Sequence, residues 1–178
     1  MDKLAAKNAV KVVDLLNERL AFERAGVKLY DIVLARLRAS SDPSMKPLLE
    51  RAQHFRDEEK EHEEWLEEQI RALGGDAHTP TEHSVLVQRE SQGVEQVVMR
   101  DSSIAHDMHA LLVAELADNE GWDLLVQLAD EFGDSKAKKQ FKKRLREEKE
   151  HLLFVRETVL ELTRKDVSVP AGSGPQIA

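Results

Sequence analysis

The feature that most limits how this chain can fold is a set of four long segments in which apolar residues recur at steps of three and four. That spacing places the apolar side chains on one face of an α-helix. The segments cover about residues 3–39, 43–73, 102–132 and 135–164. Helices of this length exceed the usual helix of a globular protein and must bury their apolar faces against one another. The sequence therefore predicts a bundle of helices that lie side by side.

Turn signals between the segments set the predicted topology. The first pair meets at Asp42 and Pro43, which can cap and begin the next helix, and the second pair meets at residues 133–135. Short connections make each pair an antiparallel hairpin. Residues 74–101 are long enough to travel the length of the bundle, with a short helix expected at 93–100. The predicted fold is therefore all-α, an up-down-down-up four-helix bundle with a long crossover between the second and third helices.

The length and charge of the chain indicate the number of domains and the kinds of partner that it can bind. The chain has 178 residues, which suits one domain. We expect this domain over residues 1–165 and a flexible tail rich in Pro, Gly and Ser over 166–178. The net charge of −8 disfavours nucleic acids and anionic membranes and favours cations as partners. No apolar run approaches the roughly 18 residues of a membrane span, and the first residues lack the apolar stretch of a signal peptide.

The absence of cysteine excludes several kinds of metal site. Zinc sites with thiolate ligands and iron–sulfur clusters both require cysteine, and the chain has none. A chain without disulfides fits a reducing compartment, so we expect a cytoplasmic protein.

Acidic residues and histidines interrupt the four apolar stripes and are the candidate functional residues. Each stripe contains a glutamate near its middle, and the second and fourth stripes also contain a histidine one turn later. Residues three apart on a helix share a face, so each Glu and His pair can reach the same point. The interrupting residues are Glu23, Glu59, His62, Glu115, Glu148 and His151.

Buried carboxylates at one depth of a bundle require positive charge among them. An unpaired buried carboxylate costs several kcal/mol, and four together repel one another and take up protons. Arg19 is the only arginine close to the stripes, and no lysine joins them. A pair of metal cations solves the problem with the fewest assumptions. Four carboxylates and two imidazoles form an oxygen and nitrogen set that suits iron or manganese.

An internal repeat supports the same arrangement. Glu23 is followed by Tyr30 about two helical turns later, and Glu115 is followed by Trp122 at the same spacing. In both halves of the chain the Glu-x-x-His pair follows the first glutamate at a similar distance. The chain therefore reads as two similar hairpins related by a pseudo-twofold axis, with the metals close to that axis. We interpret Tyr30 and Trp122 as core aromatic residues rather than redox relays.

Two hairpins, each with a glutamate on its first helix and Glu-x-x-His on its second, resemble the ferritin-like di-iron carboxylate proteins, such as bacterioferritin and rubrerythrin. The resemblance covers about residues 8–163. It implies two iron ions, with manganese or a mixed manganese and iron pair as the alternative. By this resemblance Glu59 and Glu148 bridge the ions, Glu23 and Glu115 are terminal ligands, and each histidine binds one ion.

The resemblance implies a chemistry but leaves three functions open. The first is an oxidoreductase that oxidises Fe(II) with O2 or peroxide, which is ferroxidase or peroxidase chemistry. The second is a non-catalytic iron-binding or assembly protein, and the third is a helical interaction module without metal. The chain lacks the cysteine-ligated electron-transfer domain of rubrerythrin-type proteins, and its tail lacks the fifth-helix pattern of a storage cage.

Other polar residues near the motifs receive structural interpretations. Asn119, one turn after Glu115, could hydrogen-bond a metal-binding histidine. Glutamates off the stripes are expected to form a solvated face: Glu18, Glu58, Glu61, Glu63, Glu64, Glu147 and Glu150.

Apolar residues on the outer faces of the first and third segments suggest a homodimer. Long helices with surplus apolar side chains outside the stripes can associate with a second copy. The residues in question are Val12, Val13, Leu125 and Leu128.

Overall fold

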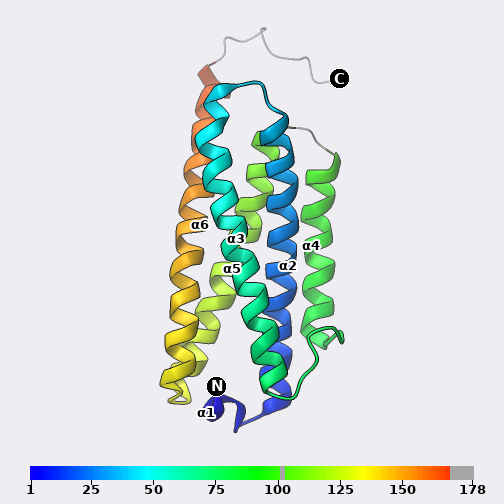
Figure 1. Ribbon diagram of the computed structural model, residues 1–178, viewed down its shortest axis with the longest axis vertical. Coiled ribbons are helices and arrows are strands. Elements are labelled where there is room, and N and C mark those ends of the chain that lie inside the picture. The colour runs from blue at the N-terminus through cyan, green and yellow to red at the C-terminus, as the bar shows by residue number, and fades with distance from the viewer. Residues whose placement is uncertain (101–102, 169–178) are drawn as a thin grey trace.

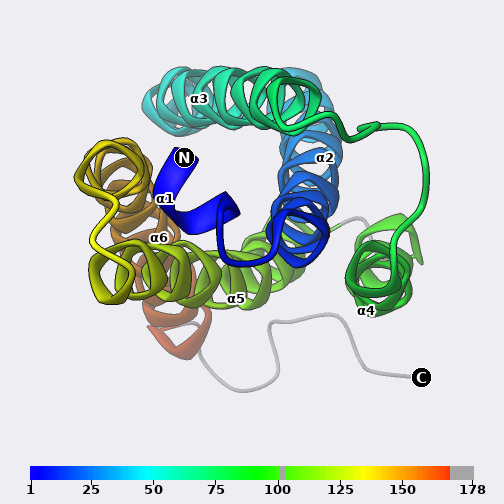
Figure 2. The ribbon, with the colours of Figure 1, turned by 90° about the horizontal axis from the view of Figure 1, so that it is seen from below.

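The bundle consists of four long helices at the corners of a square, as the end-on view in Figure 2 shows. The computed structural model describes residues 1–100 and 103–168, and every regular element in these ranges is a helix. In Figure 1, α2 and α6 run upward while α3 and α5 run downward, so the predicted up-down-down-up topology is confirmed. The four helices are α2 (Ala9–Ala39), α3 (Lys46–Ala72), α5 (Ile104–Glu131) and α6 (Ser135–Ser168).

The first long helix starts later than the sequence predicted. A separate short helix, α1 (Asp2–Ala5), precedes it and lies across one end of the bundle (Figure 2). The side chain of Asn8 accepts a hydrogen bond from the backbone N–H of Lys11 at 3.1 Å and so caps α2. The prediction of one continuous helix from Lys3 is therefore wrong.

The crossover is largely helical, and more so than expected. Helix α4 (Glu82–Arg100) has 19 residues, whereas the sequence predicted a helix only over 93–100. The hydroxyl groups of Thr81 and Ser84 each accept a hydrogen bond from the other residue's backbone N–H, at 3.4 and 2.8 Å. This reciprocal capping starts the helix early. Helix α4 lies outside the square beside α2 and α5 (Figure 2), and it carries the chain back to the top of the bundle (Figure 1).

The ends of the last two helices also differ from the prediction. The expected start of the third helix at Ser102 lies outside the described residues, and α5 begins at Ile104. Helix α6 continues to Ser168, so the first residues of the expected tail are helical. The rest of that tail, 169–178, lies outside the described residues, and the division into a domain and a tail stays a prediction. None of the helices in the described part combines the length and apolar character that a membrane span needs.

The apolar core is divided into two clusters by a polar layer at mid-height. The first cluster includes Leu16, Leu20, Leu66, Ile70, Trp122, Leu125, Phe141 and Leu145. The second includes Leu29, Tyr30, Val33, Leu34, Phe55, Met108, Leu111, Phe154 and Val155. The division follows from the sequence, because each long helix places its inward glutamate between two apolar stretches.

The apolar residues that suggested a dimer belong to the core. Val12 and Leu125 are 6% and 2% exposed, and Val13 and Leu128 pack against the same cluster. Leu4 of α1 is also part of that cluster, so the short first helix helps to cover this end of the bundle. The interpretation of these residues as surplus outer surface is wrong, because all four belong to the first apolar cluster or pack against it.

Asp134 joins α1 to the second hairpin. One carboxylate oxygen accepts from the backbone N–H of Ala137 at 3.0 Å and caps α6, and the other accepts from Lys3 and Leu4 at 3.0 and 3.2 Å. Burial by itself would raise the pKa of Asp134, but the hydrogen bonds from Ala137 and Leu4 outweigh burial and lower it. The folded state therefore favours the ionised carboxylate.

We predict that Asp134→Ala lowers the free energy of unfolding by about 1–2 kcal/mol at pH 7. Because the folded pKa is lowered, this contribution is fully present above the unfolded pKa of about 4 and is lost as pH falls through the folded pKa. Urea unfolding at pH 7 and pH 3 measures both effects. Asp130→Ala, which removes an exposed ion pair with Lys138, is the control and should cost much less. Equal losses for the two variants would contradict the capping role.

Candidate metal centre

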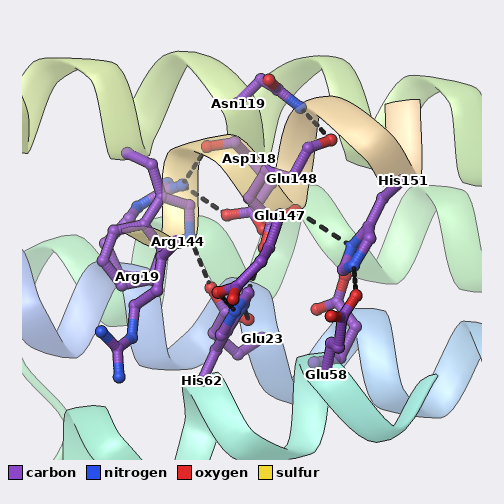
Figure 3. Close-up of polar contacts among 12 residues, drawn as sticks. Arg19, Glu23, Glu58, His62, Asp118, Asn119, Arg144, Glu147, Glu148 and His151 are labelled. Atoms are coloured by element: carbon purple, nitrogen blue, oxygen red, sulfur yellow. Dashed lines mark hydrogen bonds and ion pairs between the residues drawn. The ribbon is translucent and has the colours of Figure 1, made fainter. Parts of the chain in front are cut away.

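All six predicted site residues meet in the polar layer between the two apolar clusters. Figure 3 shows His62 on α3 and His151 on α6 directed toward acidic side chains that lie between the helices. Their side chains are almost completely enclosed, with residue exposures between 0% and 3%. Helix α2 contributes Glu23, α3 contributes Glu59 and His62, α5 contributes Glu115, and α6 contributes Glu148 and His151.

The first half of the site surrounds Nδ1 of His62. This atom lies 2.8 Å from Oε1 of Glu148 and 3.3 Å from Oε2 of Glu23. Neither approach has the angle of a hydrogen bond, since Nδ1 of His62 has no hydrogen-bond partner among the described residues. Three potential ligand atoms therefore face one another from three different helices.

The second half surrounds Nδ1 of His151. This atom lies 3.2 Å from Oε1 of Glu59, 3.3 Å from Oε2 of Glu148 and 3.9 Å from Oε2 of Glu115. In each half the possible ligand atoms lie within 4.8 Å of one another, which suits bonds of about 2.0–2.2 Å to an ion at the centre. Glu148 belongs to both halves, so its two oxygens face two neighbouring positions.

The outer nitrogen of each histidine binds a glutamate of the other hairpin, on a neighbouring helix. Nε2 of His62 lies 3.1 Å from Oε2 of Glu147, and Nε2 of His151 lies 2.9 Å from Oε2 of Glu58. Burial would raise the pKa of Glu147, but the hydrogen bonds from His62 and Lys143 lower it to about 2. These carboxylates therefore hold a proton on Nε2 and leave Nδ1 to face the site.

The prediction that Glu58 and Glu147 form part of a solvated face is therefore wrong. Each precedes a Glu-x-x-His motif, and the two hairpins share the same run, Glu-Glu-Lys-Glu-His, at 58–62 and 147–151. That exact repetition is the sequence signal that could have identified them. Glu61, Glu64 and Glu150 are exposed, as predicted.

Two aromatic side chains donate hydrogen bonds to the glutamates of the opposite hairpin. The hydroxyl of Tyr30 on α2 donates to Oε1 of Glu115 on α5 at 2.6 Å. The indole N–H of Trp122 on α5 donates to Oε1 of Glu23 on α2 at 2.8 Å. The spacing that revealed the internal repeat thus produces a matched pair of crossed contacts. Both residues are buried in the core as predicted, and each also fixes one carboxylate.

Most of the remaining inward oxygen atoms lack a hydrogen bond. Among the described residues, buried atoms without a hydrogen-bond partner include Oε2 of Glu23, Oε2 of Glu59, Oε2 of Glu115 and both side-chain oxygens of Glu148. A buried carboxylate oxygen without a partner is costly unless a cation is close. The donor set and its unpartnered oxygens therefore fit hard or borderline metal ions.

The raised pKa values of the buried side chains show that this layer is stabilised by positive charge. Burial, together with Glu148 and Glu23, raises the pKa of Glu59 well above its usual value. Burial and Glu148 likewise raise the pKa of Glu115 to about 8, although His151 opposes the shift. Burial would lower the pKa of His62, but Glu23 and Glu147 raise it to about 12. The side chains alone thus retain protons at neutral pH, and a bound cation would have to displace them.

Two buried arginines lie beside this layer, and each has another partner. The guanidinium of Arg19 binds Oδ1 of Asp118 at 2.7 Å. A Cβ at Gly121 would lie 1.9 Å from that guanidinium, so a larger residue there would force Arg19 out of this position. The guanidinium of Arg144 lies 3.6 Å from the centre of the Trp65 ring. The prediction that Arg19 is the only arginine close to the stripes is wrong, because Arg144 is also buried beside this layer. Asp118 was not singled out in the sequence, because it follows Glu115 by one turn in a helix rich in polar residues.

Asn119 has a different role from the one expected. Its side-chain amide donates to the backbone carbonyl oxygens of Glu115 at 3.1 Å and Glu148 at 2.9 Å. It therefore joins α5 to α6 at the height of the site and makes no hydrogen bond to a histidine. The possible Asn119–His contact is not formed, because both hydrogen bonds of the amide go to backbone carbonyl oxygens.

Fold and site together define a ferritin-like bundle with a carboxylate and histidine layer that can bind metal. The family model for rubrerythrin matches residues 14–159. The chain therefore belongs to the rubrerythrin family, a family of ferritin-like di-iron carboxylate proteins. Among curated proteins, none matches the chain. The assignment of the six individual residues as ligands stays a prediction.

We predict that Glu147→Ala weakens the binding of Mn(II) by about 10–100-fold, because His62 loses the carboxylate that orients it. Isothermal titration calorimetry on the metal-free protein measures the affinity. Glu150→Ala is the matched control, since Glu150 is exposed on the same helix and in the same five-residue run. Equal affinities for the two variants would show that Glu147 does not support the site.

Proposed function

We propose that this chain is a di-iron oxidoreductase that binds two ferrous ions and oxidises them with O2 or peroxide. The observation that carries the proposal is the group of buried carboxylate oxygens that face one space without hydrogen-bond partners among the described residues. The residues proposed to hold one ion are Glu23, His62 and Glu148, and those proposed to hold the other are Glu59, Glu115, His151 and Glu148.

Iron is the proposed metal, with manganese or a mixed pair as the alternative. Carboxylate and imidazole ligands suit both metals, and membership of the rubrerythrin family favours iron. When bound, the two ions would supply electrons and Lewis acidity. The cytoplasmic location stays a prediction, as does the homodimer, which has lost its sequence argument.

The protein's own contribution would be to fix the ligands and limit water. Tyr30 and Trp122 each hold one glutamate by a hydrogen bond, which restricts rotation of that carboxylate. Glu58 and Glu147 keep a proton on each Nε2. Once a bound cation had displaced the Nδ1 protons, the lone pair of each Nδ1 would point inward. The apolar clusters above and below exclude bulk water, which strengthens electrostatic interactions inside the layer.

We predict that Mn(II) raises the melting temperature of the metal-free protein. A ligand that binds only the folded state at 100 times its Kd stabilises it by about 2.7 kcal/mol, or roughly 5–10 °C for a chain of this size. Differential scanning calorimetry measures the shift. Glu59→Gln should remove most of it, whereas His83→Ala, in a separate surface group with Asp14 and Glu82, should leave it unchanged. The opposite pattern would move the metal site to that surface group.

We also predict that the protein takes up two Fe(II) per chain under anaerobic conditions. Addition of H2O2 or air should then produce ferric absorbance within one turnover, because the bound pair can deliver two electrons. Stopped-flow spectroscopy follows the reaction, with Glu59→Gln as the inactive variant and Glu150→Gln as the control. Stable, colourless Fe(II) after exposure to both oxidants would instead favour the non-catalytic iron-binding alternative.

A further inference from the structure

A cavity of about 170 Å³ connects the surface with the metal layer between α2, α4 and α5. At its inner end lie the carboxylates of Glu59 and Glu115. At its outer end lie Glu90 on α4 and Val113 on α5, both of which are exposed. The cavity therefore leads from solvent to one half of the proposed di-iron site.

The walls of the cavity are apolar along most of its length. Leu29 of α2 and Leu111 of α5 are 1% and 0% exposed, and Val94 of α4 closes the outer side. Apolar cavities of about 150 Å³ stay dry and bind molecules the size of benzene. This cavity combines such walls with a polar inner end, so its shape and chemistry suit a small molecule with one polar and one apolar end.

Small residues keep the inner end open. A Cβ at Gly26 would lie 2.5 Å from Oε2 of Glu59, so a larger residue there would force this carboxylate to shift. Ala25 and Ala114 line the same region. Larger side chains at these positions would fill the space between the carboxylates and the apolar walls. The crossover helix α4 therefore connects the two hairpins and also forms one wall of the cavity.

We propose that this cavity binds a small organic hydroperoxide, with its O–O–H group at Glu59 and Glu115 and its apolar group between Leu29, Val94 and Leu111. The proposal rests on the proposed function and names its substrate class. The apolar walls favour such a molecule over H2O2, which has no apolar group to bury.

The two ferrous ions of the proposed site would be the reductant for this hydroperoxide. The O–O bond of R–O–O–H breaks on receipt of two electrons from two ferrous ions and two protons from solvent. The products are the alcohol R–O–H and one water molecule, and both ions become ferric. No further co-reactant is needed for this single turnover.

The test compares two substitutions on the same helix. Val94→Phe fills the cavity, whereas Val97→Phe adds the same ring at a position that is 52% exposed and outside the cavity lining. We expect Val94→Phe to slow oxidation of the Fe(II)-loaded protein by tert-butyl hydroperoxide about tenfold or more. Oxidation by H2O2, which is smaller, should be unchanged, and Val97→Phe should match the unmodified protein with both oxidants. Ala114→Leu fills the cavity from α5 and guards against a folding defect in Val94→Phe.

A second measurement reports binding without turnover. In Zn(II)-loaded protein, tert-butanol should shift the methyl NMR signals of Leu29 and Leu111 in a saturable manner. The shifts should persist in Val97→Phe and disappear in Val94→Phe and Ala114→Leu. If the methyl signals did not shift, or if all variants reacted with tert-butyl hydroperoxide at equal rates, the cavity proposal would be overturned. Normal oxidation by H2O2 in the same samples would still support the di-iron function. Failure of both oxidants would reject the proposed function, and the methyl titration would still decide whether the cavity binds.

Discussion

The structure depends on the desolvation of four glutamates at one height of a helical bundle. Removing a carboxylate from water costs several kcal/mol, and neighbouring carboxylates add repulsion. Tyr30 and Trp122 satisfy one oxygen each on two of the glutamates, and the histidines carry the compensating protons. The two apolar clusters on either side prevent the helices from separating to let water in. Such a layer sacrifices stability, which is typical of a functional site.

The pseudo-twofold arrangement makes each hairpin support the buried site residues of the other. Tyr30 of the first hairpin holds Glu115 of the second, and Trp122 holds Glu23 in return. In the same way, Glu58 of the first hairpin contacts His151 of the second, and Glu147 contacts His62 in return. Neither hairpin can therefore form its half of the site alone. The crossover helix α4 allows the second hairpin to start at the far end of the bundle (Figure 1). Its inner face borders the cavity that reaches Glu59.

Helical periodicity was sufficient to predict the four long helices and the six residues that meet in the polar layer, and the lengths of the connections predicted the topology. It could not predict the contacts of side chains that leave the stripe. Glu147 lies next to the stripe on its own helix, yet it reaches His62 on a neighbouring helix. The sequence of either helix alone does not determine how far apart the two helices pack. Val12 likewise shares its apolar cluster with Leu4 of α1, whose backbone N–H donates to the distant Asp134. Local sequence shows which residues share a helix face. The wrong predictions for Glu147 and Val12 concern contacts between elements that are far apart in the chain.

The most direct test of the central claim is the position of bound metal. Crystals loaded with Fe(II) under anaerobic conditions and measured at the iron absorption edge would show anomalous scattering from iron alone. We predict two peaks between α2, α3, α5 and α6, one beside Nδ1 of His62 and one beside Nδ1 of His151, with Glu148 between them. A layer without iron peaks, or iron bound only at the surface beside His83, would contradict it.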